Sequence, residues 1–158
     1  MQISVSREPS TSPAVRALVY CALEELNRRY GANADDHSLS FEELDEPTGA
    51  FFVARIDAHL AGGVALRRIG ADTERAGEVK RLWVRPDVRQ AGVAQRLMDE
   101  LEDFAPQLGV RSIYLETGDR QPEAIKFYAR IGYERVGAFP EGVDHYPEGL
   151  KFLKVLAG

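Results

Sequence analysis

The chain has 158 residues, 44% of them hydrophobic and 28% charged, a balance typical of one globular domain, and we expect residues 1–158 to form a single domain. Its 20 Lys and Arg against 25 Asp and Glu give a net charge of -5, which argues against a general nucleic-acid-binding protein, because such proteins bind mainly by neutralising phosphates. No apolar run is long enough to span a membrane, and residues 1–7 lack the layout of a signal peptide, so we expect a cytoplasmic protein without a membrane partner.

The first part of the chain predicts a strand followed by a helix. The strand is expected at residues 2–6, and the helix is expected to be capped by Ser12, opened by Pro13 and ended by Gly31. A short helix is expected at residues 41–44.

Three strands are expected next, at residues 50–56, 60–69 and 78–85, and the residues at 57–59 between the first two are typical of a hairpin turn. In the third strand the apolar residue after Val79 is Leu82, so the period-two pattern slips by one position near Lys80 and Arg81. A β-bulge produces such a slip.

The second half alternates helices and strands. Apolar residues at helical spacing predict a helix from Val93 to near Gly109, and a second helix is expected from Gln121-Pro122 to a stop at Gly132. The expected strands are residues 110–116, 133–139 and 149–156. The resulting order, β-α-α-β-β-β-α-β-α-β-β, indicates an α/β (α+β) fold with a mixed sheet and covering helices.

The segment Arg89-Gln90-Ala91-Gly92-Val93-Ala94 joins a strand to a helix. A small, glycine-containing loop at this place presents unpaired backbone N–H groups and the positive end of the helix dipole, which together suit a pyrophosphate. The segment is neither a Walker loop nor a dinucleotide fingerprint, because it lacks Gly-Lys-Ser/Thr and has one of three glycines. A loop that merely turns the chain remains the alternative.

The segment, with the bulged strand before it, resembles the acetyl-CoA-binding motif of the GNAT superfamily of N-acetyltransferases. The family pattern Gln/Arg-x-x-Gly-x-Gly/Ala is complete as Arg89-x-x-Gly92-x-Ala94. Residues 78–84 resemble the family's fourth strand, and residues 124–133 resemble its later helix and strand, A-x-x-x-Y-x-x-x-G-F/Y. The resemblance therefore extends over most of the chain.

This resemblance implies a mostly antiparallel sheet of six to seven strands with about four helices, and transfer of an acetyl group from acetyl-CoA, the cosubstrate, to a primary amine. Pantetheine is expected to pair as an added strand along Leu82, Trp83 and Val84. The pyrophosphate is expected at Arg89, Gln90, Ala91, Gly92, Val93 and Ala94. Gln121 stands where many members carry Asn, and its longer side chain leaves its cofactor contact open.

The resemblance also implies two catalytic residues. A lysine-like amine with a pKa of about 10.4 is almost fully protonated at neutral pH, so a base is needed, and Glu78 stands at the family's glutamate position. The alternative for Glu78 is a solvated carboxylate paired with Lys80 or Arg81. Tyr128 stands at the family's acid position and would protonate the leaving thiolate, with an aromatic core residue as the alternative.

A bulge near Leu82 or Trp83 would leave a backbone N–H for the oxyanion. Cys21 lies among apolar residues and is expected in the core, a reactive thiol being the alternative. The histidines lack ligand spacing, so we expect no metal. A homodimer remains open, because the sequence does not define the assembly state.

The acceptor is expected to contact residues 30–47 and 139–150. Their acidic side chains favour a cationic small molecule or a lysine or N-terminal amine of a peptide, unless they are simply solvated. These side chains are Asp35, Asp36, Glu42, Glu43, Asp45, Glu46, Glu141 and Asp144. Two alternatives remain: a longer acyl donor, and a catalytically silent acyl-CoA-binding module with a regulatory or interaction role.

Overall fold

A computed structural model describes residues 1–31, 39–143, 145–146 and 148–157. Within them the α-helices are α1 (Pro13–Tyr30), α2 (Val93–Phe104) and α3 (Pro122–Arg130). The strands are β1 (Ile3–Arg7), β2 (Gly49–Ile56), β3 (His59–Ile69), β4 (Ala76–Val84), β5 (Ser112–Thr117), β6 (Glu134–Val136) and β7 (Leu150–Val155). The predicted order of elements is confirmed, with a 3-10 helix, η1 (Phe41–Leu44), in the place of the short second helix.

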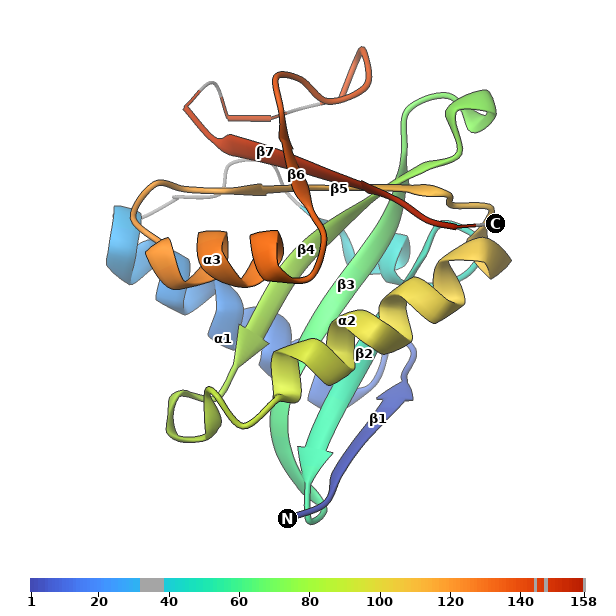
Figure 1. The fold of residues 1–158 in the computed structure, drawn as a ribbon. Coiled ribbons are helices and arrows are strands. Elements are labelled where there is room, and N and C mark those ends of the chain that lie inside the picture. The colour runs from blue at the N-terminus through green and yellow to red at the C-terminus, as the bar shows by residue number, and fades with distance from the viewer. Residues whose placement is uncertain (32–38, 144, 147, 158) are drawn as a thin grey trace.

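The strands form one seven-stranded sheet in the order β1-β2-β3-β4-β5-β7-β6. All neighbours are antiparallel except β4 and β5, which pair in parallel over only three positions, from Ala76↔Ser112 to Glu78↔Tyr114. Beyond Glu78 and Tyr114 the two strands diverge, as Figure 1 shows. The sheet is therefore split from its middle to one edge.

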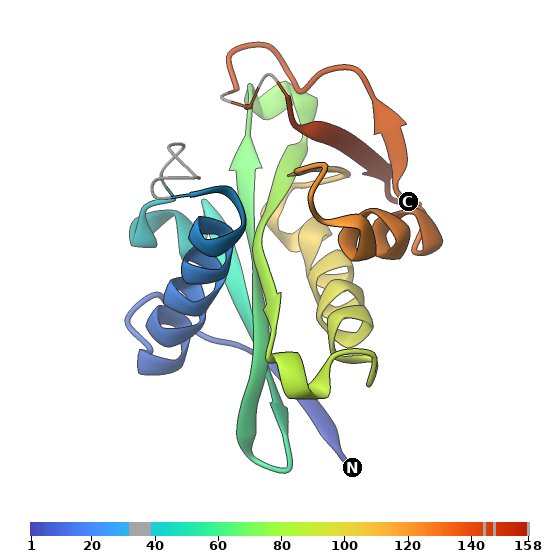
Figure 2. The same cartoon turned by 90° about the vertical axis from the view of Figure 1, so that its left-hand side faces the viewer.

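Helices cover both faces of the sheet. Figure 2 shows α1 on one face and α2 with α3 on the other. The larger apolar cluster packs α2 and α3 against the sheet through Leu97, Leu101 and Tyr128, and the smaller cluster packs α1 through Val15 and Leu18. The opening between β4 and β5 thus lies between α1 and α3.

The β-bulge predicted in the fourth strand is present. Between the pairs Gly63↔Trp83 and Ala65↔Lys80, β3 has one residue and β4 has two. Arg81 has a φ of 59°, a left-handed conformation that is uncommon for a residue with a side chain. The bulge interrupts the pairing of β4 with β3 at the point where β5 has already departed, and the pairing resumes at Trp83.

The sequence predicted the start of α1 correctly and the end of α2 incorrectly. Ser12 Oγ accepts a hydrogen bond from the Ala14 N–H at 3.2 Å, which confirms the predicted cap of α1. The prediction of one helix from Val93 to Gly109 was too long, because the α-helix ends at Phe104. Pro106 has no N–H and its ring opposes continuation, so a 3-10 turn follows.

Candidate functional site

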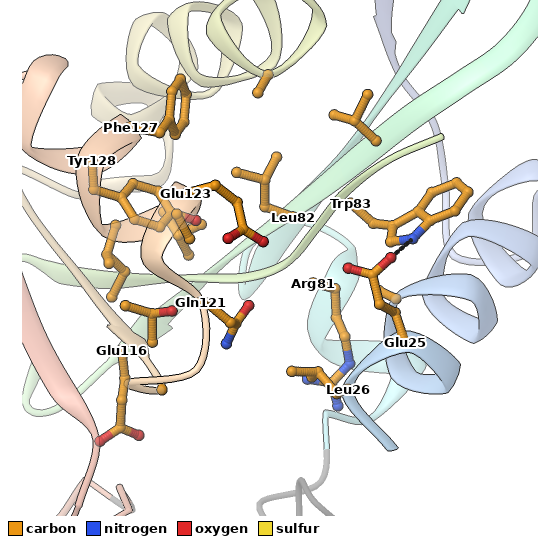
Figure 3. Close-up of a pocket in the computed structure, with 18 of the residues that line it drawn as sticks. Glu25, Leu26, Arg81, Leu82, Trp83, Glu116, Gln121, Glu123, Phe127 and Tyr128 are labelled. Carbon is orange, nitrogen blue, oxygen red and sulfur yellow. Dashed lines mark hydrogen bonds between the residues drawn. The ribbon is translucent and has the colours of Figure 1, made fainter. Parts of the chain in front are cut away.

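A cleft of about 880 Å³ occupies the gap between the diverging strands. Its walls come from the C-terminal half of α1, the bulged part of β4, the loop before α2, the end of β5 and the first turns of α3. In Figure 3, Glu25 and Leu26 of α1 lie on one side of β4, and Phe127 and Tyr128 of α3 lie on the other. The cleft is therefore lined by residues from both faces of the sheet.

The loop predicted to hold a pyrophosphate lines this cleft. Gly92 caps α2 with a φ of 93°, and Gln90 is also left-handed at 70°. Among the described residues no group accepts a hydrogen bond from the backbone N–H groups of residues 91–94. A Cβ built on Gly92 would meet nothing within 4 Å, so the space in front of these N–H groups is clear. This loop has the properties of an anion cradle.

Arg89 turns back toward the sheet from this loop. Its Nη2 donates to Glu25 Oε1 at 2.6 Å, and its Nε donates to the Val84 carbonyl oxygen at 2.8 Å. Glu25 also accepts a hydrogen bond from the Trp83 indole at 3.3 Å. Arg89 therefore fixes the loop to β4 and α1, and its predicted contact with a pyrophosphate stays a prediction.

The residues predicted to meet pantetheine lie together on the cleft wall. Leu82, Trp83 and Val84 follow the bulge, and Trp83 packs its ring with the cluster under α1. Gln121 stands at the N-cap of α3, where its side chain caps nothing, and Figure 3 shows it projecting into the opening. Val93 is buried beneath the loop and Ala94 is half-buried.

Glu78 lies at the base of the cleft and is only 4% exposed, which excludes a solvated carboxylate. Its partner is Arg67, the residue directly opposite on β3, whose Nε and Nη2 both donate to Glu78 Oε1 at 3.2 and 3.0 Å. No described residue donates a hydrogen bond to Oε2. Burial raises the pKa of Glu78, against the opposing effects of Lys80 and Arg67. Such a carboxylate is more basic than an exposed one.

Tyr128 lines the opposite wall and is 7% exposed. Its ring packs against Phe127, Tyr133 and Phe152, while its hydroxyl has no hydrogen-bond partner among the described residues. Burial alone raises the pKa of Tyr128 far above its ordinary value, so the phenol stays protonated at any working pH. The ring of Tyr128 therefore belongs to the apolar core, and the residue also lines the cleft.

A set of contacts that sequence patterns did not reveal joins the end of α1 to the first turn of α3 and to the residue at 120 just before it. Arg29 Nη2 pairs with Glu123 Oε1 at 2.7 Å, and Arg29 Nη1 donates to the Arg120 carbonyl oxygen at 3.1 Å. The Arg120 N–H donates to the Tyr30 hydroxyl at 3.0 Å. These partners are about ninety residues apart in sequence, and only the fold brings them together.

Thr117 is a second lining residue that the sequence did not single out. It is the last residue of β5, is 6% exposed and lines the cleft. Its Oγ1 is buried and has no hydrogen-bond partner among the described residues.

Residues 20–133 match the family model of the acetyltransferase (GNAT) family. The chain belongs to this family. The predicted family membership, fold and acetyl-CoA-dependent N-acetyltransferase activity are thereby confirmed, and the enzyme transfers an acetyl group from acetyl-CoA to an amine.

Individual relatives match along most of the chain. An IAA acetyltransferase of Azospirillum brasilense is 35% identical over 90% of this chain and 92% of its own length. An S-(2-succino)cysteine N-acetyltransferase of Bacillus subtilis is 26% identical over 95% and 93%. The PaiA N-acetyltransferase of Thermoplasma acidophilum, solved with coenzyme A, shares the fold with a TM-score of 0.72 at 18% identity over 99% of this chain and 100% of its own.

Three further expectations concerned Cys21, membrane spans and metal sites. Cys21 is half-buried on α1, does not line the cleft, and has a pKa raised by burial, so the structure gives no sign of a reactive thiol. None of the described helices is long and apolar enough to cross a membrane. Within the described part of the chain, no group of His, Cys, Asp and Glu is arranged to hold a metal ion.

Proposed function

We propose that acetyl-CoA binds with its pyrophosphate on the loop at residues 89–94 and its pantetheine arm in the cleft beside Leu82, Trp83 and Val84. The clear space over Gly92, the unpaired N–H groups of residues 91–94 and the split between β4 and β5 support this placement. The arm would end between the two candidate catalytic residues, Glu78 and Tyr128, which both line the same cleft.

Glu78 is proposed as the general base. Oε1 is held by Arg67, while Oε2 carries no described hydrogen bond and would take the proton of the acceptor ammonium, directly or through a water. The amine nitrogen then attacks the thioester carbonyl carbon, and the carbon–sulfur bond breaks. Tyr128 is proposed to donate its hydroxyl proton, or a hydrogen bond, to the leaving sulfur. A backbone N–H at the bulge, near Leu82 or Trp83, would receive the oxyanion.

The acceptor is proposed to reach Glu78 from the face covered by α1. Glu78 and its partner Arg67 lie on this face, because Arg67 also pairs with Glu43 of η1 at 3.1 Å. A small-molecule amine is favoured over a protein amine, since the Bacillus subtilis relative matched over nearly its whole length is named for a small amino acid derivative. A cytoplasmic location and a homodimer stay predictions.

The expectation that acidic loops attract a cationic acceptor also stays a prediction, with little support from the described residues. Glu43 pairs with Arg67, Asp45 accepts hydrogen bonds from Ser10, and Glu46 pairs with Arg7 at 3.4 Å. None of these three carboxylates lines the cleft. Asp35, Asp36 and Asp144 lie outside the described residues.

A carboxylate placed over the loop tests the proposed cofactor site. The wild-type protein is expected to bind acetyl-CoA in a calorimetric titration, and Gly92→Glu is expected to bind at least about tenfold more weakly, because the new side chain fills the clear space and repels the pyrophosphate. Wild-type protein that is folded and fails to bind acetyl-CoA would refute the site.

Gly109 supplies a matched control. It also has a positive φ, 76°, and a Cβ built there also meets nothing within 4 Å, but it lies at the far end of α2 and away from the cleft. Gly109→Glu therefore carries a similar backbone strain and the same added charge. Equal weakening by both substitutions would assign the loss to strain and not to the pyrophosphate site.

A further inference from the structure

The buried hydroxyl of Thr117 lowers the stability of the fold, because it lacks a hydrogen-bond partner in the described part of the chain. Thr117 Oγ1 has almost no exposed surface and no hydrogen-bond partner among the described residues. A buried polar atom without a partner destabilises a fold, whereas most such atoms in proteins are satisfied. A valine would fill the same volume without this cost, so the hydroxyl calls for a ligand or water in the cleft that it lines.

The position of Thr117 indicates which ligand. It lies three residues beyond Tyr114, the last β5 residue paired with β4, and so stands where the two strands have just separated. Ile113, Leu115 and Thr117 are the buried residues of β5, in alternation with half-buried ones. Ile113 and Leu115 pack in the cluster that holds Tyr128, so Thr117 points to the α3 side of the sheet.

Three polar groups without described partners thus line the cleft: the hydroxyl of Tyr128, the side-chain amide of Gln121 and the hydroxyl of Thr117. Val79 and Leu115 add apolar surface to the cleft, and the carboxylates of Glu116 and Glu123, which also line it, are paired with Lys151 and Arg29. Uncharged polar groups beside apolar side chains suit a ligand with isolated amide or carbonyl groups. The acceptor amine is proposed to arrive on the other face, where the charged pair Glu78 and Arg67 lies.

We propose that the Thr117 hydroxyl forms a hydrogen bond with the reactive end of the pantetheine arm, at its last amide or at the thioester carbonyl. This inference rests on the proposed placement of acetyl-CoA in the cleft. A hydroxyl can both donate and accept, so it can serve either group. By fixing the end of the arm, Thr117 positions the acetyl group between the two walls, and the bound cosubstrate supplies the hydrogen-bond partner of its buried hydroxyl.

Thr117→Val is expected to change two measurements in opposite directions. Without ligand the variant should unfold at a temperature about 2–4 °C higher than wild type, because the unsatisfied hydroxyl is gone. In calorimetric titration it should bind acetyl-CoA about three- to tenfold more weakly, the effect of one lost hydrogen bond. Thr117→Ser keeps the hydroxyl and should retain wild-type affinity.

Adenosine 3'-phosphate 5'-diphosphate keeps the pyrophosphate and lacks the pantetheine arm, so it separates this inference from the placement on which it rests. Thr117→Val should bind this nucleotide as wild type does. The variant should lose affinity for both CoA and acetyl-CoA if the amide is the partner, or for acetyl-CoA alone if the thioester is. Unchanged affinity for acetyl-CoA, or an equal loss for the nucleotide, would overturn the inference while leaving the loop site intact. Failure of the wild type to bind any of the three would instead refute the placement itself.

Discussion

Tyr128→Phe is expected to lower kcat by at least about 100-fold while leaving the fold and acetyl-CoA affinity nearly unchanged. The ring makes the packing contacts with Phe127, Tyr133 and Phe152, and phenylalanine keeps that ring. The hydroxyl has no described partner to lose. The measurement is the rate of thiol release from acetyl-CoA with an acceptor found by screening amines, at saturating concentrations of both substrates.

Burial of the Tyr128 hydroxyl determines whether it donates a full proton or a hydrogen bond. It raises the pKa of Tyr128 far above the ordinary value, so the group is always available as a donor between pH 6 and pH 9. The same rise makes full proton transfer to a thiolate with a pKa of about 8.5 uphill, unless the thiol is buried too and its pKa rises with it. A hydrogen bond that strengthens as charge develops on sulfur avoids this difficulty.

Tyr133→Phe is the matched control. Tyr133 lies against Tyr128 and is similarly buried, but its hydroxyl donates to Glu102 at 3.0 Å and it does not line the cleft. Its loss should cost stability and not turnover. Wild-type turnover by Tyr128→Phe, or the same loss in both variants, would remove Tyr128 from the reaction.

The parts of the fold that the sequence predicted are those with local causes. Ser12 and Pro13 define the start of α1 within a few residues of chain, and the phase slip at Lys80 and Arg81 marks the bulge because alternation is a property of one strand. The loop at Gly92 was singled out because small residues around a glycine leave backbone N–H groups accessible to an anion. These signals need no knowledge of the neighbours in space.

The contacts that the sequence did not reveal join residues that are distant in the chain and close only in the folded structure. Glu25 and Arg89 are 64 positions apart, and no spacing rule connects a helix face to a loop that the sheet brings beside it. The alternative interpretation of Glu78 paired it with Lys80 or Arg81, whereas its ion-pair partner is Arg67, because β3 and β4 pair in the register that places Arg67 opposite Glu78. That register is set by the connection from Ile69 to Ala76, and the bulge lies beyond it, between Lys80 and Trp83.

Glu78→Gln is expected to lower kcat/KM at pH 7 by about 100-fold and to change the pH dependence of the reaction. In wild type, activity should fall as pH drops through the raised pKa of Glu78, since only the ionised carboxylate accepts a proton. Without the base, the reaction depends on amine that is already deprotonated in solution, so the rate should rise about tenfold per pH unit up to pH 9. The deficit of the variant should therefore shrink as pH increases.

The raised pKa of Glu78 also predicts how the free energy of unfolding changes with pH. The folded state holds the proton of Glu78 more tightly than the unfolded chain, so this residue favours folding below the unfolded pKa, and that contribution is lost as pH rises through the higher folded value. Glutamine, which stays neutral, should flatten this part of the curve of unfolding free energy against pH. Chemical denaturation of both proteins between pH 4 and pH 8 measures it.

The variant Glu43→Gln tests whether Glu78 acts as a base or only neutralises the charge of Arg67. Glu43 is the other partner of Arg67, at 3.1 Å, but it does not line the cleft. If Glu78 served only to neutralise Arg67, both substitutions would disturb the same guanidinium and change activity in parallel at every pH. A base predicts that Glu43→Gln keeps the wild-type pH profile and that Glu78→Gln alone gains the steep dependence on pH. A Glu78→Gln enzyme that matches wild type from pH 6 to pH 9 would end the assignment.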